Sequence, residues 1–153
     1  MTLKLLEGVT KFGSGARLRH NIPEDERNYV YKNVVTGYPY KFDNAIAGKT
    51  GTTQNQSDGW FIGMVPNLVT GVWVGGEDRS IHFEKIAYGQ GATMSLPIWG
   101  LFMKKCYEDE ELGVSKEDFE EPDNLTIELD CSKVQPEKSE SEENDINDLL
   151  GIG

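Results

Sequence analysis

Four consecutive residues, Lys49-Thr50-Gly51-Thr52, place a cation, two hydroxyls and a glycine side by side in a segment, 44–53, that we expect to form a strand. The two hydroxyls can bind a carboxylate, and Lys49 supplies positive charge beside it. Gly51 clears one strand face, so that an extended peptide can lie alongside and take backbone hydrogen bonds. A backbone N–H at the end of this run can face a developing oxyanion. The segment therefore predicts a site for a peptide that carries a carboxylate.

Two other kinds of site fit the sequence less well. Gly48-Lys49-Thr50 matches the end of a phosphate-binding loop, but the position that should hold the first glycine is Asp43, and no long helix is predicted after Thr50. A metal site is not expected, because His20 and His82 have no second ligand at a suitable spacing. The two cysteines, Cys106 and Cys131, are too few for a metal site; a disulfide and two free thiols both remain open.

The elements around the motif predict an α+β fold, in which a three-stranded antiparallel meander has a helix before it and a helix after it. The strands are expected at 44–53, 59–65 and 68–75, with Pro66-Asn67 as a hairpin turn. At least one edge strand should stay unpaired within this chain. The helices are expected at 2–12 and 94–108.

Apolar side chains are assigned to packing positions by their spacing. In the first helix Leu5, Leu6, Val9 and Phe12 share a face, and in the second Ile98, Leu101, Phe102 and Cys106 do, with Pro97 near the first turn. On the strands, Trp60, Phe61 and Trp73 are interpreted as core or packing residues and not as substrate platforms. Asp58 is interpreted as a turn or strand-start residue.

Three segments together resemble the C-terminal strands and helix of class A, bifunctional penicillin-binding proteins. The first is Ile46 to Thr53 with its Lys-Thr-Gly element, the second is the hairpin made of Asp58 to Gly63 and Pro66 to Gly75, and the third is Gly91 to Trp99. The segment from Met1 to Ala16 is similar to the helix and glycine-rich turn that precede the Lys-Thr-Gly strand in that family. The resemblance covers roughly residues 1–108 and implies a partial penicillin-binding transpeptidase fold.

The resemblance implies that Lys49, Thr50, Gly51 and Thr52 form the substrate-binding strand, with the Thr52 amide as the second oxyanion donor. The family's nucleophile is the serine of a Ser-x-x-Lys element, and no such element and no Ser-x-Asn occurs in this sequence. Tyr31-Lys32-Asn33 imitates a Tyr-x-Asn variant but lies too close to Lys49, so Tyr31 and Asn33 are interpreted as surface residues. We therefore expect no catalytic residue in this chain, and the chain alone should be inactive, because a serine nucleophile and its base must lie within hydrogen-bond reach.

For the parent protein, the resemblance implies a peptidoglycan D,D-transpeptidase, with a glycosyltransferase half, at the periplasmic face of the inner membrane. It implies no cofactor. The implied partners are stem peptides ending in D-Ala-D-Ala, β-lactams and the remainder of the transpeptidase domain. The sequence has no apolar run of the length that a membrane span needs, so this segment is expected to be soluble and to make no membrane contact.

The charge is concentrated towards the C-terminus. Residues 1–106 carry a net charge of +3, whereas residues 107–153 carry −14. Residues 109–153 are expected to form an acidic, largely disordered tail after the domain part at 1–108, with one weak strand at 123–131. Such a tail disfavours nucleic acid as a partner. The alternative to the enzyme fragment is a non-enzymatic cell-envelope interaction module, in which the tail binds a partner and Lys-Thr-Gly is a coincidence.

Overall fold

The computed structural model describes residues 2–19 and 40–121. The segments expected as a weak strand at 123–131 and as surface residues at Tyr31 and Asn33 lie outside the described residues, as do His20 and Cys131. The described residues belong to one compact unit. Helix α1 (Thr2–Lys11) and the short turn η1 (Ala16–Leu18) precede the sheet, and α2 (Ile86–Gly89), α3 (Gly91–Glu108) and η3 (Glu110–Leu112) follow it.

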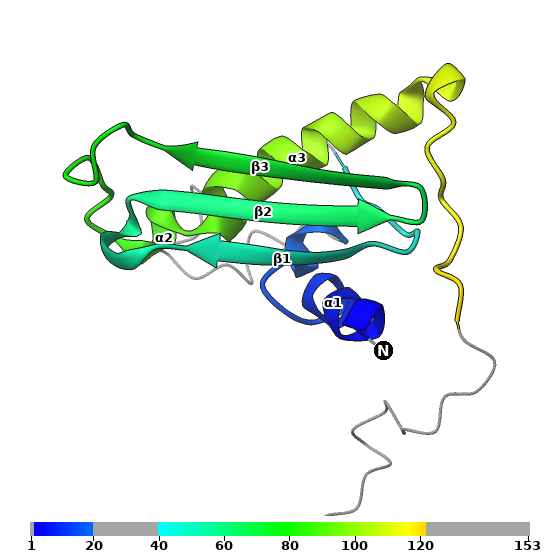
Figure 1. The fold of residues 1–153 in the computed structure, drawn as a ribbon, viewed down its shortest axis with the longest axis horizontal. Helices are drawn as coiled ribbons and strands as arrows, with labels where there is room; N and C mark the ends of the chain where they lie inside the picture. The colour runs from blue at the N-terminus through cyan, green and yellow to red at the C-terminus, as the bar shows by residue number, and fades with distance from the viewer. Residues whose placement is uncertain (1, 20–39, 122–153) are drawn as a thin grey trace, which may run out of the picture. The chain divides into compact units, whose positions relative to one another are not determined.

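The sheet has three antiparallel strands in the order β1-β2-β3 (Figure 1). They are β1 (Ala47–Thr52), β2 (Asp58–Val65) and β3 (Leu68–Gly75). The turn Pro66-Asn67 joins β2 to β3 with Val65 opposite Leu68, as a two-residue hairpin requires. These findings confirm the predicted α+β class, with helices before and after a three-stranded meander.

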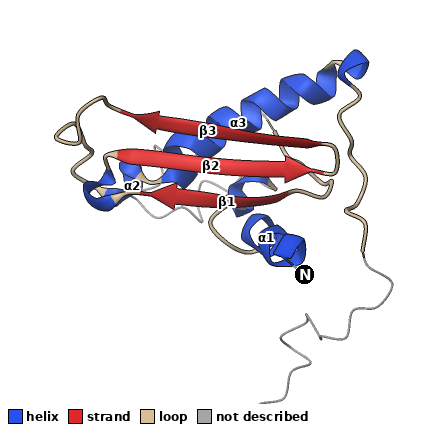
Figure 2. Ribbon diagram, viewed as in Figure 1, coloured by secondary structure: helices blue, strands red, loops and turns tan. Residues whose placement is uncertain are grey.

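One face of the sheet packs against α3, which passes behind β2 and β3 in Figure 2. Phe61 and Trp99 are fully buried at this interface, and their rings meet edge to face with centroids 5.2 Å apart. A side chain at Gly63 would overlap the Trp99 ring, because the nearest ring atoms lie where a Cβ would stand. The core therefore depends on the Trp99 ring packing directly over Gly63, which has no side chain.

Of the three aromatic residues predicted to be core or packing residues, only Phe61 is buried in the core. Side chains alternate along a strand, so Trp60 points to the face opposite Phe61. Trp60 is 44% exposed and Trp73 is 47% exposed. This face, turned away from α3, also carries the exposed side chains of Ile62 and Val69.

The apolar face predicted for α1 packs only in part, because Leu6 and Val9 are partly buried and the other two residues are not. Leu5 is 62% exposed and Phe12 is 90% exposed, whereas Glu7 and Thr10 are buried. The helix is held at the sheet by a polar contact, in which the Thr10 hydroxyl donates to the carbonyl oxygen of Ile46 at 2.5 Å. Glu7 lies between Lys4 and Lys11, which neutralise its buried carboxylate.

Helix α3 begins at Gly91, three residues before the predicted start, so Pro97 lies inside the helix and not in its first turn. Its buried residues include Ala92, Ser95, Leu96, Trp99, Met103 and Cys106. The predicted packing face is wrong except for Cys106, because Ile98, Leu101 and Phe102 are each nearly half exposed. Among the described residues, no helix is long and apolar enough to cross a membrane.

Candidate functional site

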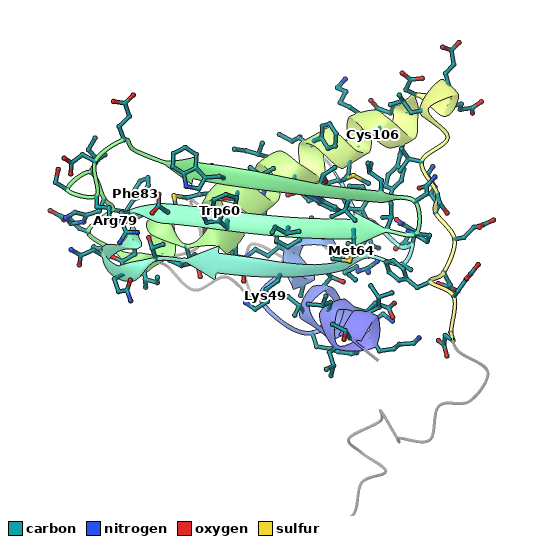
Figure 3. The ribbon with its side chains drawn as sticks, viewed as in Figure 1. Lys49, Trp60, Met64, Arg79, Phe83 and Cys106 are labelled. Atoms are coloured by element: carbon teal, nitrogen blue, oxygen red, sulfur yellow. The ribbon has the colours of Figure 1, made fainter. Side chains whose placement is uncertain are left out.

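The Lys-Thr-Gly-Thr run occupies the C-terminal part of β1, and within the described ranges β1 pairs with β2 alone. It therefore lies on an edge strand, as the sequence predicts for one strand of the meander. Lys49 extends from β1 in Figure 3, while Trp60 extends from the neighbouring strand β2. An edge strand presents backbone groups that a further extended chain can pair with.

The ladder between β1 and β2 decides which backbone groups face that edge. The Thr53 N–H donates to the Asp58 carbonyl at 3.1 Å, which makes this pair a hydrogen-bonded one. Hydrogen-bonded and non-hydrogen-bonded pairs alternate in an antiparallel ladder, so Lys49 and Gly51 direct their backbone groups towards β2. Thr50 and Thr52 direct theirs towards the open edge.

These outward groups differ in whether they are already hydrogen-bonded. Within residues 2–19 and 40–121, the Thr52 N–H has no hydrogen-bond acceptor. The Thr50 carbonyl accepts a hydrogen bond from Nζ of Lys49 at 2.6 Å. Upstream of the Lys-Thr-Gly-Thr run, α1 covers the same edge, because the Thr10 hydroxyl donates a hydrogen bond to the outward carbonyl of Ile46. The accessible length of edge thus begins after the part that α1 covers and includes Thr50 and Thr52.

The side chains of the run divide between the two faces of the strand. Thr50 lies opposite Phe61 in the register, so Thr50 and Thr52 belong to the face that turns towards α3. Lys49 and Gly51 belong to the other face, where Gly51 lies opposite Trp60. A Cβ at Gly51 would meet the Cβ of Trp60 at 3.2 Å. Because residue 51 is a glycine, no side chain protrudes from this face of β1 beside the Trp60 side chain.

Both threonine hydroxyls are held by neighbouring elements. The Ser14 and Thr50 hydroxyl oxygens lie 2.6 Å apart. The backbone N–H of Gly91, at the start of α3, donates to Oγ1 of Thr52 at 3.1 Å. Sequence spacing does not reveal Ser14 and the Gly91 N–H as partners of the two threonines, since neither is near the motif in the chain. The Gly-Ser-Gly turn at 13–15 is the only local signal for the first of them.

The turn after the run is stabilised by a polar cluster around Asp58. Its Oδ2 accepts from the Thr53 hydroxyl at 3.2 Å, and its Oδ1 accepts from Nε1 of Trp73 at 3.1 Å. The turn contains Asn55 and Gln56 with φ of 59° and 52°. Asp58 is the first residue of β2, as predicted, and the cluster shows that it also links the turn to β3.

Other groups with possible chemistry lie apart from this edge or lack partners. Within the described part of the chain, no hydrogen bond joins a serine hydroxyl to a lysine or histidine side chain, and no group of three metal-ligating residues occurs. The His82 side chain is exposed, with Nδ1 3.3 Å from the Phe83 carbonyl. Cys106 is a buried free thiol whose pKa is raised by burial. A cavity of about 500 Å³ borders Tyr40, Lys104 and Tyr107, and does not include the Lys-Thr-Gly-Thr run.

Comparison with known proteins finds similarity to penicillin-binding proteins. No family model matches the chain. The chain is 37% identical over 90 residues to penicillin-binding protein 1A of Aquifex aeolicus, which covers 57% of this chain and 11% of that protein. It is 33% identical over 102 residues to penicillin-binding protein 1A of Escherichia coli, covering 59% of this chain and 12% of that protein. A third relative, penicillin-binding protein 1A of Neisseria flavescens, is 46% identical over 54 residues, covering 35% of this chain and 6% of that protein.

These similarities confirm the resemblance to class A penicillin-binding proteins. The chain spans little more than a tenth of the length of the first two relatives, so it corresponds to one segment of such a protein.

Proposed function

We propose that this chain supplies the substrate-binding strand of a serine-type peptidoglycan D,D-transpeptidase. In this proposal Lys49, Thr50, Gly51 and Thr52 bind a stem peptide ending in D-Ala-D-Ala, or a β-lactam that replaces it. The observation that carries the proposal is the accessible edge of β1, where the Thr52 N–H points outward without an acceptor in the described residues. A peptide added along this edge would continue the antiparallel sheet.

Each residue has a distinct role in the proposal. The Thr52 N–H donates to the oxyanion that develops when the peptide carbonyl is attacked. The hydroxyls of Thr50 and Thr52 bind the C-terminal carboxylate, and Lys49 contributes positive charge at the same edge. Gly51 has no side chain that would obstruct the peptide backbone as it approaches the strand.

The nucleophile is proposed to lie in another part of the parent protein. There a serine Oγ forms an ester with the carbonyl carbon of the penultimate D-Ala, the peptide C–N bond breaks, and the terminal D-Ala leaves with the proton that a base transfers to its nitrogen. The amine of a second stem peptide then displaces the serine. Since this sequence has no Ser-x-x-Lys, the chain alone is expected not to be acylated.

We also propose that the remainder of the transpeptidase domain packs on the sheet face turned away from α3. Trp60, Ile62, Val69 and Trp73 expose a continuous apolar surface on two adjacent strands. Apolar surfaces of this kind mark interfaces in soluble proteins. Residues 1–108 would then be the C-terminal part of that domain, and residues 109–153 an acidic tail. The parent would lie at the periplasmic face of the inner membrane, carry a glycosyltransferase half and need no cofactor.

The test uses an antibody raised against this chain and cell lysate labelled with fluorescent penicillin. A labelled band much heavier than 17.1 kDa that the antibody also recognises supports the proposal. An unlabelled antibody-reactive band near 17.1 kDa would instead favour the non-enzymatic interaction module. Intact-mass measurement of the isolated chain after incubation with penicillin should show no adduct; an adduct would contradict its proposed inactivity.

A further inference from the structure

Ser14 is brought to the open edge of β1 by the turn between α1 and η1. Its hydroxyl oxygen lies 2.6 Å from Oγ1 of Thr50, although 36 residues separate the two in the chain. The turn is held on both sides of Ser14, because the Gly13 N–H donates to the Gly8 carbonyl at 3.2 Å and the Gly15 N–H donates to the Val9 carbonyl at 2.9 Å. Ser14 is therefore fixed by backbone bonds and not by its side chain alone.

The partner of Thr52 shows what such a contact does. Oγ1 of Thr52 accepts a hydrogen bond from the Gly91 N–H at 3.1 Å, so the donor is defined. A hydroxyl has one proton and two lone pairs. With one lone pair occupied by Gly91, the Thr52 proton is free to be donated to a ligand.

Thr50 can present its proton to a ligand in the same way only if Ser14 is the donor in the hydrogen bond between the two hydroxyls. If Thr50 donated to Ser14, its proton would be used and its oxygen could only repel a carboxylate. If Ser14 donates to Thr50, the Thr50 proton is available to the ligand. Thr50 and Thr52 lie two residues apart on one face of β1, about 7 Å along the strand, so two hydroxyl protons can then approach one carboxylate from both sides.

We propose that Ser14 is a positioning residue of the carboxylate site, which donates to Thr50 and thereby directs the Thr50 proton to the C-terminal carboxylate of the peptide or β-lactam. The inference rests on the proposed function, because it assigns a further residue to the same site. Ser14 acts through Thr50 and has no contact with the reacting carbonyl. Its effect is therefore specific to ligands that carry a carboxylate.

A purely structural role for Ser14 makes a different prediction. If the contact merely attached the turn to β1, its loss would disturb the whole edge and would weaken every ligand alike. If the contact orients the Thr50 proton, its loss weakens a ligand with a free carboxylate and spares the same ligand when the carboxylate is esterified.

The experiment measures the second-order rate of acylation of the full-length parent by benzylpenicillin and by its methyl ester. The variants are Ser14→Ala, Ser14→Thr, which keeps the hydroxyl, and Ser80→Ala as an exposed serine in the loop after β3. We expect Ser14→Ala to lower the rate with benzylpenicillin about fivefold, as for the loss of one hydrogen bond between neutral groups, and to leave the rate with the ester within about twofold. Ser14→Thr and Ser80→Ala should stay close to the wild-type rates.

Each other result has a defined meaning. Equal losses for both ligands, or no loss for benzylpenicillin, would overturn the role of Ser14 while leaving the proposed function intact. A wild-type parent that is not acylated at all would overturn the proposed function, and this inference with it. Melting temperatures of the variants identify a general loss of folding, and Ser14→Thr then serves as the variant that keeps the hydrogen bond.

Discussion

Trp60 of β2 and Trp73 of β3 lie directly opposite each other on the sheet face turned away from α3, with ring centroids 6.4 Å apart and planes tilted by 48°. The Trp73 ring is also fixed by its hydrogen bond to Asp58, at the turn that follows the Lys-Thr-Gly-Thr run. Two ordered rings that remain nearly half exposed form a shaped apolar surface. The apolar surface on β2 and β3 adjoins β1, because β1 pairs with β2. One partner could therefore cover both this surface and the open edge of β1.

Replacing Gly63 with alanine should destabilise the chain. The added methyl group would overlap the Trp99 ring, and its nearest contact with the Phe61 ring would be 2.9 Å. Overpacking of a buried site typically costs about 1–3 kcal/mol in the free energy of unfolding. Urea unfolding followed by tryptophan fluorescence measures this loss.

Gly8→Ala is the matched control for that substitution. A Cβ at Gly8 would meet nothing within 4 Å, and Gly8 lies inside α1. Alanine there should stabilise the chain by about 0.5–1 kcal/mol, because glycine loses more backbone entropy in a helix. If Gly63→Ala stabilised the chain as Gly8→Ala does, the close fit of Trp99 over Gly63 would be contradicted.

Two threonines with different hydrogen bonding should respond differently to valine. The Thr10 hydroxyl donates to Ile46 and accepts from Nη2 of Arg19 at 3.2 Å. Thr10→Val leaves both groups without this partner and should cost about 1–3 kcal/mol. In contrast, the buried Thr70 hydroxyl has no partner among the described residues, so Thr70→Val should be neutral or slightly stabilising. Urea midpoints compare the two variants, and a larger loss of stability for Thr70→Val would contradict the hydrogen bonds of Thr10 and the lack of one at Thr70.

The stability of the chain should fall at alkaline pH in part because of Tyr107. Burial raises the pKa of the Tyr107 phenol, against the opposing effects of the Asn44 hydrogen bond and Arg19. The folded state thus favours the neutral phenol, while the unfolded phenol ionises at about pH 10. The contribution to stability is fully present below about pH 10 and is lost as the pH rises through the raised value in the folded state.

Tyr107→Phe isolates this effect. The variant loses the hydrogen bond from Asn44 at 2.8 Å at every pH, so the slopes of unfolding free energy against pH are compared and not the values. Above pH 10 the slope should be less steep for the variant than for the wild type. Equal slopes would show that Tyr107 has the same pKa in both states.

The sequence predicts the strands well because alternating apolar residues and Pro66-Asn67 determine them locally. It does not predict which strand face is buried, because Trp60 and Phe61 are both large and apolar. The choice depends on Gly63, whose missing side chain lets Trp99 pack on the Phe61 side. The sequence also does not predict which face of α3 is buried. Ile98 and Trp99 are both large and apolar, but Trp99 packs against the sheet and is fully buried, whereas Ile98 is 49% exposed.

The position of Lys49 to Thr52 on an edge strand follows from the meander itself. The contact between Ser14 and Thr50 does not, since it depends on how α1 and its turn pack beside β1. Sequence spacing carries no information about a pair that is 36 residues apart and is joined by one hydrogen bond.

The exposed apolar face should make the isolated chain self-associate, and one charge should prevent this. Ile62 is 44% exposed at the centre of the face, so Ile62→Lys places an ammonium group in water and disrupts the apolar surface. Sedimentation velocity at increasing concentration should show association for the wild type and much less for Ile62→Lys, with little change in the urea midpoint. The adjacent Phe61 is fully buried, so Phe61→Lys should unfold the chain instead. If Ile62→Lys destabilised the chain as strongly as Phe61→Lys, the face would be part of the core and could not be the surface that a partner covers.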